Sequence, residues 1–226
     1  KGFTEITDRL EPEVLSTLLN SYLNEMSKIA LKYGGTIDKF VGDAILIFFG
    51  DPETKGDKED AYSCVLMALE MQERMHNLKN LWEGQGITNP LEIRIGINTG
   101  YCNVGNFGSE NRLDYTIIGG EVNLASRLES NAMTGQILIS QETYALIKKH
   151  IVCEKKDEIK VKGISHKIQT YQVVGSYKNI AQKRKILNEE FDGFNLNIDL
   201  NISKKNKVIT SLENTLKQLK KDEKSN

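Results

Sequence analysis

The fold is decided by the stretch Gly35-Thr36-Ile37-Asp38-Lys39-Phe40-Val41-Gly42-Asp43-Ala44-Ile45-Leu46-Ile47-Phe48-Phe49-Gly50. Two apolar runs, residues 36–41 and 44–49, are separated only by Gly42-Asp43. Glycine supplies the positive φ of a tight turn at little cost, so the stretch predicts a β-hairpin. Its turn would carry Asp43, with Lys39 on the preceding strand. On an arbitrary hairpin these would be a solvated aspartate and a surface lysine.

Long amphipathic helices are predicted on both sides of this hairpin. Before it, Pro12 stands at a first-turn position, and apolar residues recur at helical spacing until Gly34-Gly35. After it, a second helix is predicted from about Asp57 to Trp82, because its apolar residues form one stripe.

The remainder of the chain up to residue 177 alternates strands with helices. Strands are predicted over residues 91–100, 114–118, 136–140, 151–153, 159–161 and 168–174, helices over 121–131 and 141–149, and an irregular loop or short hairpin over 101–112. This order predicts an α/β sandwich, in which helices cover a mostly antiparallel sheet.

Composition limits the classes of protein. With 226 residues, 39% of them hydrophobic, the chain can bury one ordinary core and a small appendage. Lys and Arg total 30 against 31 Asp and Glu, so the bulk charge favours neither a nucleic-acid binder nor a protein that avoids polyanions, and any phosphate recognition must be local. No nucleic-acid partner is expected. The three cysteines lack metal-ligand spacing, and the sequence shows neither a bilayer-spanning run nor a signal peptide, so a reducing, cytoplasmic location is expected.

The sequence changes character at Lys178, where Lys and Asn become frequent. Residues 194–202 alternate apolar with polar side chains, and residues 208–219 repeat apolar side chains at helical spacing. We therefore predict a domain over residues 1–177 and an appendage over 178–226, formed by a strand and a basic amphipathic helix. Packing on the domain or on a partner helix is the favoured explanation, and membrane binding is the alternative.

Four features of the first domain invite a joint explanation. Separately, each has an ordinary one: arginines paired on the surface, an asparagine that caps a helix, a threonine that favours a strand. They are Lys39 and Asp43 on the hairpin, Arg94 on a strand, Thr116 before Gly119-Gly120, and Asn123 with Arg127 on one helix face.

Their order and spacing closely resemble the catalytic domain of class III adenylate and guanylate cyclases. The motifs that carry the resemblance are Gly2-Phe3-Thr4, Lys39-Phe40-Val41-Gly42-Asp43, Ile93-Arg94-Ile95-Gly96, Leu113-Asp114-Tyr115-Thr116, Gly119, Val122-Asn123, Arg127-Leu128-Glu129 and Val161-Lys162-Gly163. The resemblance covers about the first 175 residues. It implies a ferredoxin-like sheet covered by helices and the synthesis of a cyclic nucleotide from a nucleoside triphosphate.

The resemblance also implies a role for each motif residue. In this reaction the ribose 3′-oxygen attacks the α-phosphorus and pyrophosphate leaves, so charge stabilisation is central. Asp43 would hold metal, and the backbone amides of Gly2, Phe3 and Thr4 would cradle the triphosphate. Further roles would fall to four side chains: Arg94 and Lys162 at the leaving phosphates, Asn123 at the ribose, and Arg127 at the transition state.

Two ions, Mg²⁺ or Mn²⁺, are expected in each site, shared by two aspartates. The resemblance places the second aspartate two positions before Lys1, after a strand that is also absent from this sequence. We therefore expect the chain to be an N-terminally truncated fragment that is nearly inactive alone, with a sensor or membrane anchor possible upstream.

Lys39 and Thr116 occupy the positions at which family members contact the purine. Adenylate-forming members carry Lys with Asp or Thr there, whereas guanylate-forming members usually carry Glu and Cys. Lysine can donate to N1 of adenine, which is an acceptor, but finds no acceptor at N1–H of guanine. ATP is the expected substrate, and the pair resembles a Lys/Thr subgroup of adenylate cyclases.

The resemblance further implies a head-to-tail homodimer with two shared sites. One subunit would supply the metal ligands, the phosphate cradle and Arg94; the other would supply Lys39, Thr116, Asn123, Arg127 and Lys162. The alternatives are a guanylate cyclase and a catalytically inactive cyclase-like module for dimerisation or signalling. A diguanylate cyclase is disfavoured, because Gly119-Gly120-Glu121-Val122 matches its signature turn only in part.

Overall fold

The computed structural model describes residues 3–7, 10–84, 86–87, 90–160, 167–177, 186–191, 194–199 and 205–222. Two of the predicted site residues, Gly2 and Lys162, lie outside these ranges. The chain divides into two compact units, residues 1–174 and 175–226, and each is described by itself.

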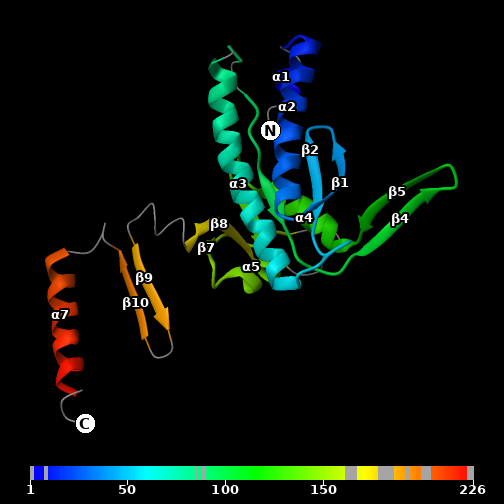
Figure 1. The fold of residues 1–226 in the computed structure, drawn as a ribbon. Helices are drawn as coiled ribbons and strands as arrows, with labels where there is room; N and C mark the ends of the chain where they lie inside the picture. Colours follow the sequence, from blue (N-terminus) through cyan, green and yellow to red (C-terminus); the bar gives the residue numbers. More distant parts are fainter. Residues whose placement is uncertain are drawn as a thin grey trace. The chain divides into compact units, whose positions relative to one another are not determined.

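The first unit combines helices with short strands (Figure 1). In chain order its elements are α1 (Phe3–Thr7), α2 (Pro12–Lys32), β1 (Thr36–Val41), β2 (Ala44–Phe48), α3 (Asp57–Gly84), β3 (Ile95–Ile97), β4 (Asn103–Ser109), β5 (Arg112–Ile118), α4 (Gly120–Asn131), β6 (Ile137–Ser140), α5 (Gln141–Ile147), β7 (Ile151–Lys155) and β8 (Thr170–Ser176).

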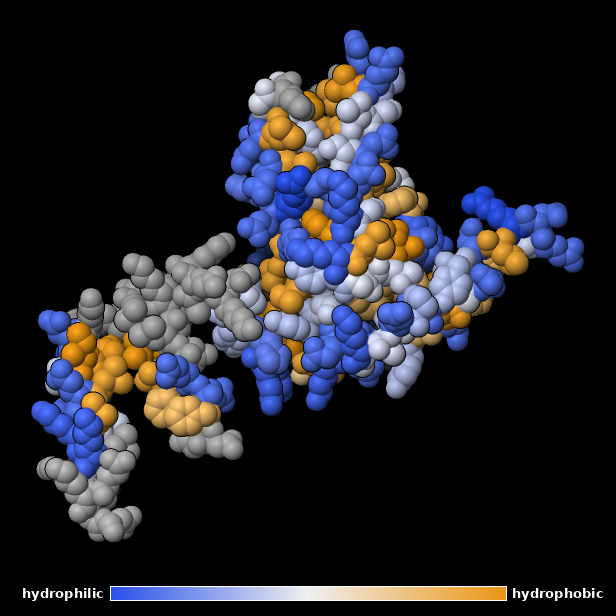
Figure 2. All heavy atoms as spheres, in the orientation of Figure 1, coloured by the Kyte–Doolittle hydropathy of each residue, from blue (hydrophilic) through white to orange (hydrophobic). Residues whose placement is uncertain are grey.

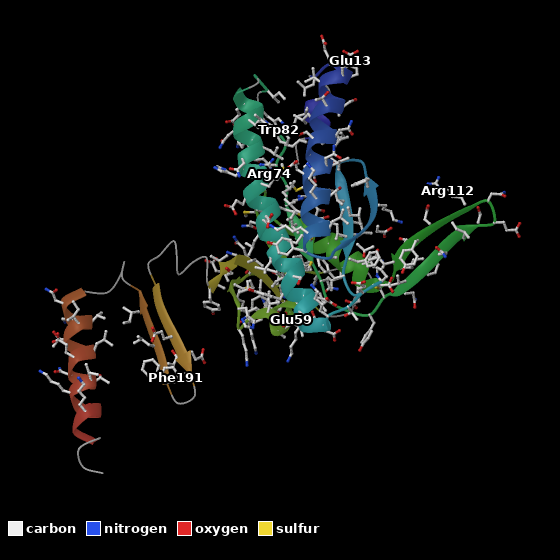
Figure 3. The ribbon with its side chains drawn as sticks, in the orientation of Figure 1. Glu13, Glu59, Arg74, Trp82, Arg112 and Phe191 are labelled. Atoms are coloured by element: carbon white, nitrogen blue, oxygen red, sulfur yellow. The ribbon has the colours of Figure 1, made fainter. Side chains whose placement is uncertain are left out.

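Helices α2 and α3 are the longest elements of this unit, and they lie side by side (Figure 3). Pro12 occupies the start of α2, where its missing N–H leaves no bond unmade, and α2 ends just before Gly34, whose φ is +83°. Across the pair, Arg74 Nε donates to Glu25 Oε2 at 2.7 Å. Both helices begin and end close to the residues predicted from their periodicity.

The apolar faces of these helices form two adjoining cores. The first joins α2 and α3 to the β1–β2 hairpin, with Met26 and Trp82 almost fully buried. The second lies between α3, α5 and the sheet, around Val65 and Ile139. Cys64 and Ile95 contact both clusters, so the hairpin and the sheet are anchored to the same helix.

The central sheet has the strand order β3-β6-β8-β7. Strand β3 runs parallel to β6, and β6 runs antiparallel to β8. Strands β1 and β2 form one separate antiparallel hairpin, and β4 and β5 form another that projects from the unit (Figure 1). The predicted class, helices with mostly antiparallel strands, is therefore what the structure has.

One prediction about strands was wrong: the strand predicted over residues 91–100 is formed only at 95–97. For residues 101–112 an irregular loop or a short hairpin was predicted, and the structure has the hairpin, because Asn103–Ser109 pairs with β5 along its whole length. Pairing satisfies the backbone polar groups of β4, and this outweighs the low strand propensity of its Gly and Asn residues. Of the strand predicted at 159–161, residues 159–160 lie within the described ranges, and Ile159 forms one antiparallel bridge with Ile168.

The second unit contains β9 (Ile186–Phe191), β10 (Phe194–Asp199) and α7 (Lys205–Asp222). The two strands pair antiparallel, and the rings of Phe191 and Phe194 stack with centroids 4.6 Å apart. A strand from residue 194 and a helix near residues 208–219 were predicted, whereas β9 was not. None of the described helices is long and apolar enough to cross a membrane.

Candidate active site

The β1–β2 hairpin positions two of the predicted site residues. Gly42, with φ +63°, makes the turn possible and places the half-buried Asp43 beside it. Tyr22 on α2 is close enough to be affected by this carboxylate: burial and the negative charge of Asp43 both raise the pKa of Tyr22. The predicted metal ligand thus lies next to the first core.

An irregularity in β1 determines where Lys39 points. Ile37 pairs with Ile47 and Lys39 pairs with Leu46, so Asp38 is an extra residue in the strand, a β-bulge. The side chain of Asp38 is 1% exposed and that of Lys39 is 44% exposed, yet Lys39 Nζ lies 3.5 Å from Asp38 Oδ1. The bulge therefore turns two successive side chains toward each other.

Thr116 reaches the same carboxylate from β5. It is buried, and its Oγ1 donates a 2.7 Å hydrogen bond to Asp38 Oδ2. The two residues predicted to read the purine, Lys39 and Thr116, are thus brought together around one buried aspartate.

Arg94 is placed directly before β3. Its Nε lies 2.5 Å from Glu129 Oε1, and its Nη1 donates to the carbonyl oxygen of Ser130 at 3.4 Å. The guanidinium is therefore already paired with the last turn of α4. A role at the leaving phosphates requires Arg94 to exchange this carboxylate for a phosphate.

Asn123 and Arg127 lie on the exposed surface of α4, as their spacing predicts. Within the described ranges, neither side chain has a recorded hydrogen bond or ion pair, so both are available to a ligand. The contacts between described residues do not join this pair to Lys39 or Thr116.

The predicted phosphate cradle is described only in part. Phe3 begins α1 and packs against the first core, and Thr4 follows it in the same helix. The N-terminus of a short helix therefore lies where the amide donors were predicted.

The described residues provide one carboxylate at the predicted metal position. They contain no group of three or more His, Cys, Asp or Glu side chains that could enclose an ion. Mg²⁺ is commonly bound by one or two carboxylates together with substrate phosphates, so Asp43 fits a site that the nucleotide itself completes.

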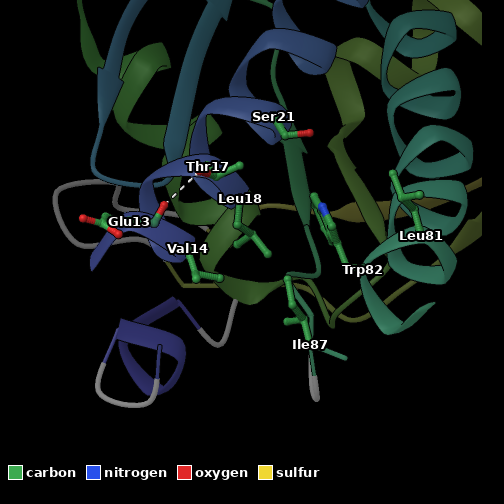
Figure 4. A pocket seen from close by; sticks show the side chains of 8 residues that line it. All are labelled: Glu13, Val14, Thr17, Leu18, Ser21, Leu81, Trp82 and Ile87. Atoms are coloured by element: carbon green, nitrogen blue, oxygen red, sulfur yellow. Dashed lines mark hydrogen bonds between the residues drawn. The ribbon is translucent and has the colours of Figure 1, made fainter. Parts of the chain in front are cut away.

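A cavity of about 320 Å³ lies elsewhere, between the start of α2 and the end of α3 (Figure 4). Its lining is Glu13, Val14, Thr17, Leu18, Ser21, Leu81, Trp82 and Ile87. The lining contains no Lys or Arg and no predicted site residue. It therefore lacks the cations that a triphosphate requires, and we do not assign the site to it.

Sequence reasoning missed two residues that hold the candidate site together, Asp38 and Glu129. Regular strand alternation would place the side chains of Asp38 and Lys39 on opposite faces of the hairpin, and a bulge has no simple sequence signature. The available signal was an unexplained aspartate between Ile37 and Lys39 on a core-facing hairpin. Glu129 was quoted only as part of a motif, and its pairing with Arg94 spans 35 positions.

The fold and these motif residues define a nucleotide cyclase domain, and the comparison of sequences agrees. The family model for the adenylate and guanylate cyclase catalytic domain matches residues 1–175. This chain belongs to that family. The predicted family and the predicted fold class are both confirmed.

Individual relatives are similar to different extents. The crystal structure of the adenylyl cyclase CyaB from P. aeruginosa is 63% identical, with a TM-score of 0.77 over 79% of this chain and 91% of that chain. The guanylyl cyclase Cya2 structure is 37% identical, with a TM-score of 0.73 over 78% of this chain and 88% of that one. Adenylate cyclase of Anabaena cylindrica is 29% identical over 184 residues, or 76% of this chain and 35% of the relative. The chain thus spans about a third of that curated relative.

Proposed function

We propose that the protein is an adenylate cyclase that converts ATP to 3′,5′-cyclic AMP and pyrophosphate. The ribose 3′-oxygen would form a bond to the α-phosphorus, and the bond from that phosphorus to the pyrophosphate oxygen would break. The observation that carries the proposal is the grouping of Lys39 and Thr116 around Asp38. The 63% identity to an adenylyl cyclase supports the same substrate.

Lys39 and Thr116 would read the edge of the adenine ring. Lys39 is sufficiently exposed to donate to N1 of a bound purine while its stem stays on β1. Guanine carries N1–H at that position and would leave the ammonium unmatched.

Asp43 would hold part of a divalent-metal site, with Mg²⁺ or Mn²⁺ as the expected ions. When bound, the metal would activate the ribose hydroxyl and neutralise phosphate charge. The contribution of the chain is to hold the Asp43 carboxylate on a rigid two-stranded hairpin that is anchored to α2.

Cationic and amide donors would position the phosphates and the ribose. Arg94 and Lys162 would bind the departing pyrophosphate, and the first amides of the chain, at Gly2, Phe3 and Thr4, would cradle it. Asn123 would hold the ribose, and Arg127 would stabilise negative charge on the transferring phosphoryl group. The exposure of Asn123 and Arg127 is consistent with these roles.

The working unit would be a head-to-tail homodimer with two shared sites. The β4–β5 hairpin supports this proposal, because large apolar and aromatic side chains are exposed on it among hydrophilic residues (Figure 2). These are Phe107, Leu113, Tyr115 and Ile118. Apolar surface of this kind gains stability when a second subunit covers it. We further propose a catalytic domain over residues 1–177, an appendage over 178–226 and a cytoplasmic location.

The test is to incubate the full-length gene product with ATP and, in parallel, with GTP, each with Mg²⁺ and with Mn²⁺. We expect cyclic AMP to form with the higher kcat/KM. Equal or faster turnover of GTP would contradict the choice of base. A folded, dimeric protein that forms neither cyclic nucleotide would instead support an inactive signalling module.

A further inference from the structure

We propose that Asp38 is a positioning residue that makes the site selective for a 6-aminopurine, by fixing the direction of the Thr116 hydroxyl and holding the Lys39 ammonium beside it. This inference rests on the proposed function and deepens it. Lys39 and Thr116 would contact the base, and Asp38 would determine which of them donates and which accepts a hydrogen bond.

In the hydrogen bond between Thr116 and Asp38, the threonine hydroxyl is the donor. A carboxylate oxygen can only accept, so the 2.7 Å contact uses the single proton of the Thr116 hydroxyl. Thr116 is 6% exposed, and its hydroxyl is therefore oriented by Asp38 and not by bulk water. Only lone pairs remain on Thr116 Oγ1 for a ligand, so Thr116 can accept from that ligand but cannot donate to it.

The other carboxylate oxygen of Asp38, Oδ1, faces the Lys39 ammonium. Asp38 Oδ1 is buried and accepts no hydrogen bond from any described residue. Lys39 Nζ, 3.5 Å away, lies within ion-pair range but beyond the 2.7–2.9 Å typical of a charge-assisted hydrogen bond. A buried acceptor without a hydrogen-bond donor lowers the stability of the folded protein, so Asp38 is a residue that the fold would not keep for stability alone. Its negative charge holds the Lys39 ammonium next to Thr116.

Together the three residues present one hydrogen-bond donor, the Lys39 ammonium, beside one acceptor, Thr116 Oγ1. Adenine offers the complementary pair along its edge: N1 accepts, and the 6-amino group donates. Guanine offers the reverse, since its N1–H donates and its 6-oxo group accepts. Guanine would therefore meet two mismatches, and rejection by unmatched polar groups is strong in a site from which water is excluded.

The β1 bulge is what makes the arrangement possible. In a regular strand Asp38 and Lys39 would point to opposite faces. With Asp38 inserted between the Ile37–Ile47 and Lys39–Leu46 pairs, one side chain reaches β5 and the other remains partly exposed beside it.

The decisive variant is Asp38→Asn in the full-length protein, measured as the ratio of kcat/KM for ATP to kcat/KM for GTP. The amide can donate to Thr116, which frees the hydroxyl proton to meet a 6-oxo group. We expect the ratio to fall about 10-fold, the equivalent of one hydrogen bond. A residue with only a structural role would lower both values together and leave the ratio unchanged.

A double-mutant comparison separates the Thr116 contact from other effects. Thr116→Val removes the hydroxyl, so adding Asp38→Asn to Thr116→Val should change the ratio far less than Asp38→Asn does in the wild type. Asp51→Asn is the matched control. Asp51 accepts a hydrogen bond from Tyr115, the neighbour of Thr116 on β5, and this variant should leave the ratio unchanged.

Asp38→Ser provides a second variant if the amide prevents folding, because a serine hydroxyl can donate or accept and no longer fixes the direction at Thr116. Its ratio should also fall. If wild-type protein prefers ATP and a folded Asp38 variant keeps the wild-type ratio within twofold, this inference is wrong while the proposed function stands. If the wild type prefers GTP, the proposed function fails and this inference fails with it.

Discussion

The Arg94 guanidinium lies 2.5 Å from the Glu129 carboxylate, a contact that joins the residue before β3 to the last turn of α4. The side chains are 31% and 40% exposed. A pair exposed to this degree is screened by solvent and contributes about 1 kcal/mol or less to stability. Its significance is therefore the placement of a cation at the junction of the sheet and the helix that carries Asn123 and Arg127.

This relationship predicts unequal effects for its two partners. Arg94→Ala should lower kcat/KM for ATP by about 100-fold or more, the typical loss when one preorganised charge is removed from a transition state. Glu129→Gln keeps the volume of the side chain and should leave kcat/KM within about threefold, because Gln can still accept from Arg94. Steady-state assays with the full-length protein test this. An equal loss in Glu129→Gln, with folding intact, would show that Glu129 itself is required for turnover.

The second prediction concerns the close approach of β3 to α4. A Cβ on Gly96 would lie 2.1 Å from the amide nitrogen of Glu129 and 2.3 Å from the carbonyl oxygen of Ala125. These are backbone atoms that cannot rotate away, so Gly96→Ala should lower the free energy of unfolding by about 3 kcal/mol. Urea unfolding followed by circular dichroism measures this change.

Gly120, the first residue of α4, is the matched control for Gly96. A Cβ there meets nothing within 4 Å, so Gly120→Ala should be neutral or should stabilise the protein by up to about 1 kcal/mol. If both variants behave alike, the separation between β3 and α4 is wider than the structure has it.

The sequence was most informative where a single periodicity dominated. Helices α2 and α3 were predicted almost to their ends, because each repeats apolar residues over many turns and carries a proline or acidic residues at its start. It was least informative for β4, whose Gly and Asn residues are typical of loops. That strand forms because β5, which has the better strand composition, supplies its partner.

The candidate site shows the same division. Lys39, Thr116, Asn123 and Arg127 could be named because motif spacing is a local property of the chain. Asp38, the buried partner of Lys39 and Thr116, could not be named, because its contact with Thr116 spans 78 positions and depends on a bulge. Pairings of this kind arise from tertiary packing, which no local pattern contains.

The third prediction tests the purine-reading pair. Lys39→Glu combined with Thr116→Cys should lower kcat/KM for ATP by about 100-fold, because the carboxylate would face N1 of adenine, also an acceptor. The expected change is largely in ATP use, and cyclic GMP production need not appear, since other groups that face the base remain unmatched. Unchanged ATP kinetics in the folded double variant would remove these two residues from the purine site.

The fourth prediction concerns residues 178–226, which contain no motif residue. A variant of the full-length protein that ends after Tyr177 keeps the whole of β8 and should retain specific activity within about threefold, while losing solubility or dimer stability. Sedimentation and cyclic AMP assays on the same sample measure the two properties. Complete loss of activity in a truncated protein that is still folded and dimeric would show that the appendage takes part in turnover.

The last prediction is that each site is built from two subunits. The proposed assignment takes Asp43 and Arg94 from one subunit and Lys39, Thr116 and Asn123 from the other. Asp43→Ala and Asn123→Ala should each abolish activity when present alone. In a heterodimer of the two, one site receives both defects and the other receives every intact group.

Mixing the Asp43→Ala and Asn123→Ala proteins should therefore restore roughly a quarter of wild-type activity, since about half of randomly formed dimers are heterodimers with one working site. Asp43→Ala mixed with Arg94→Ala is the control. Both residues come from the same side of each site, so every site in that heterodimer keeps one defect and activity should not rise above that of the separate variants. Heterodimers detected by mass without recovered activity in the first mixture, or recovery in both mixtures, would contradict the shared-site arrangement.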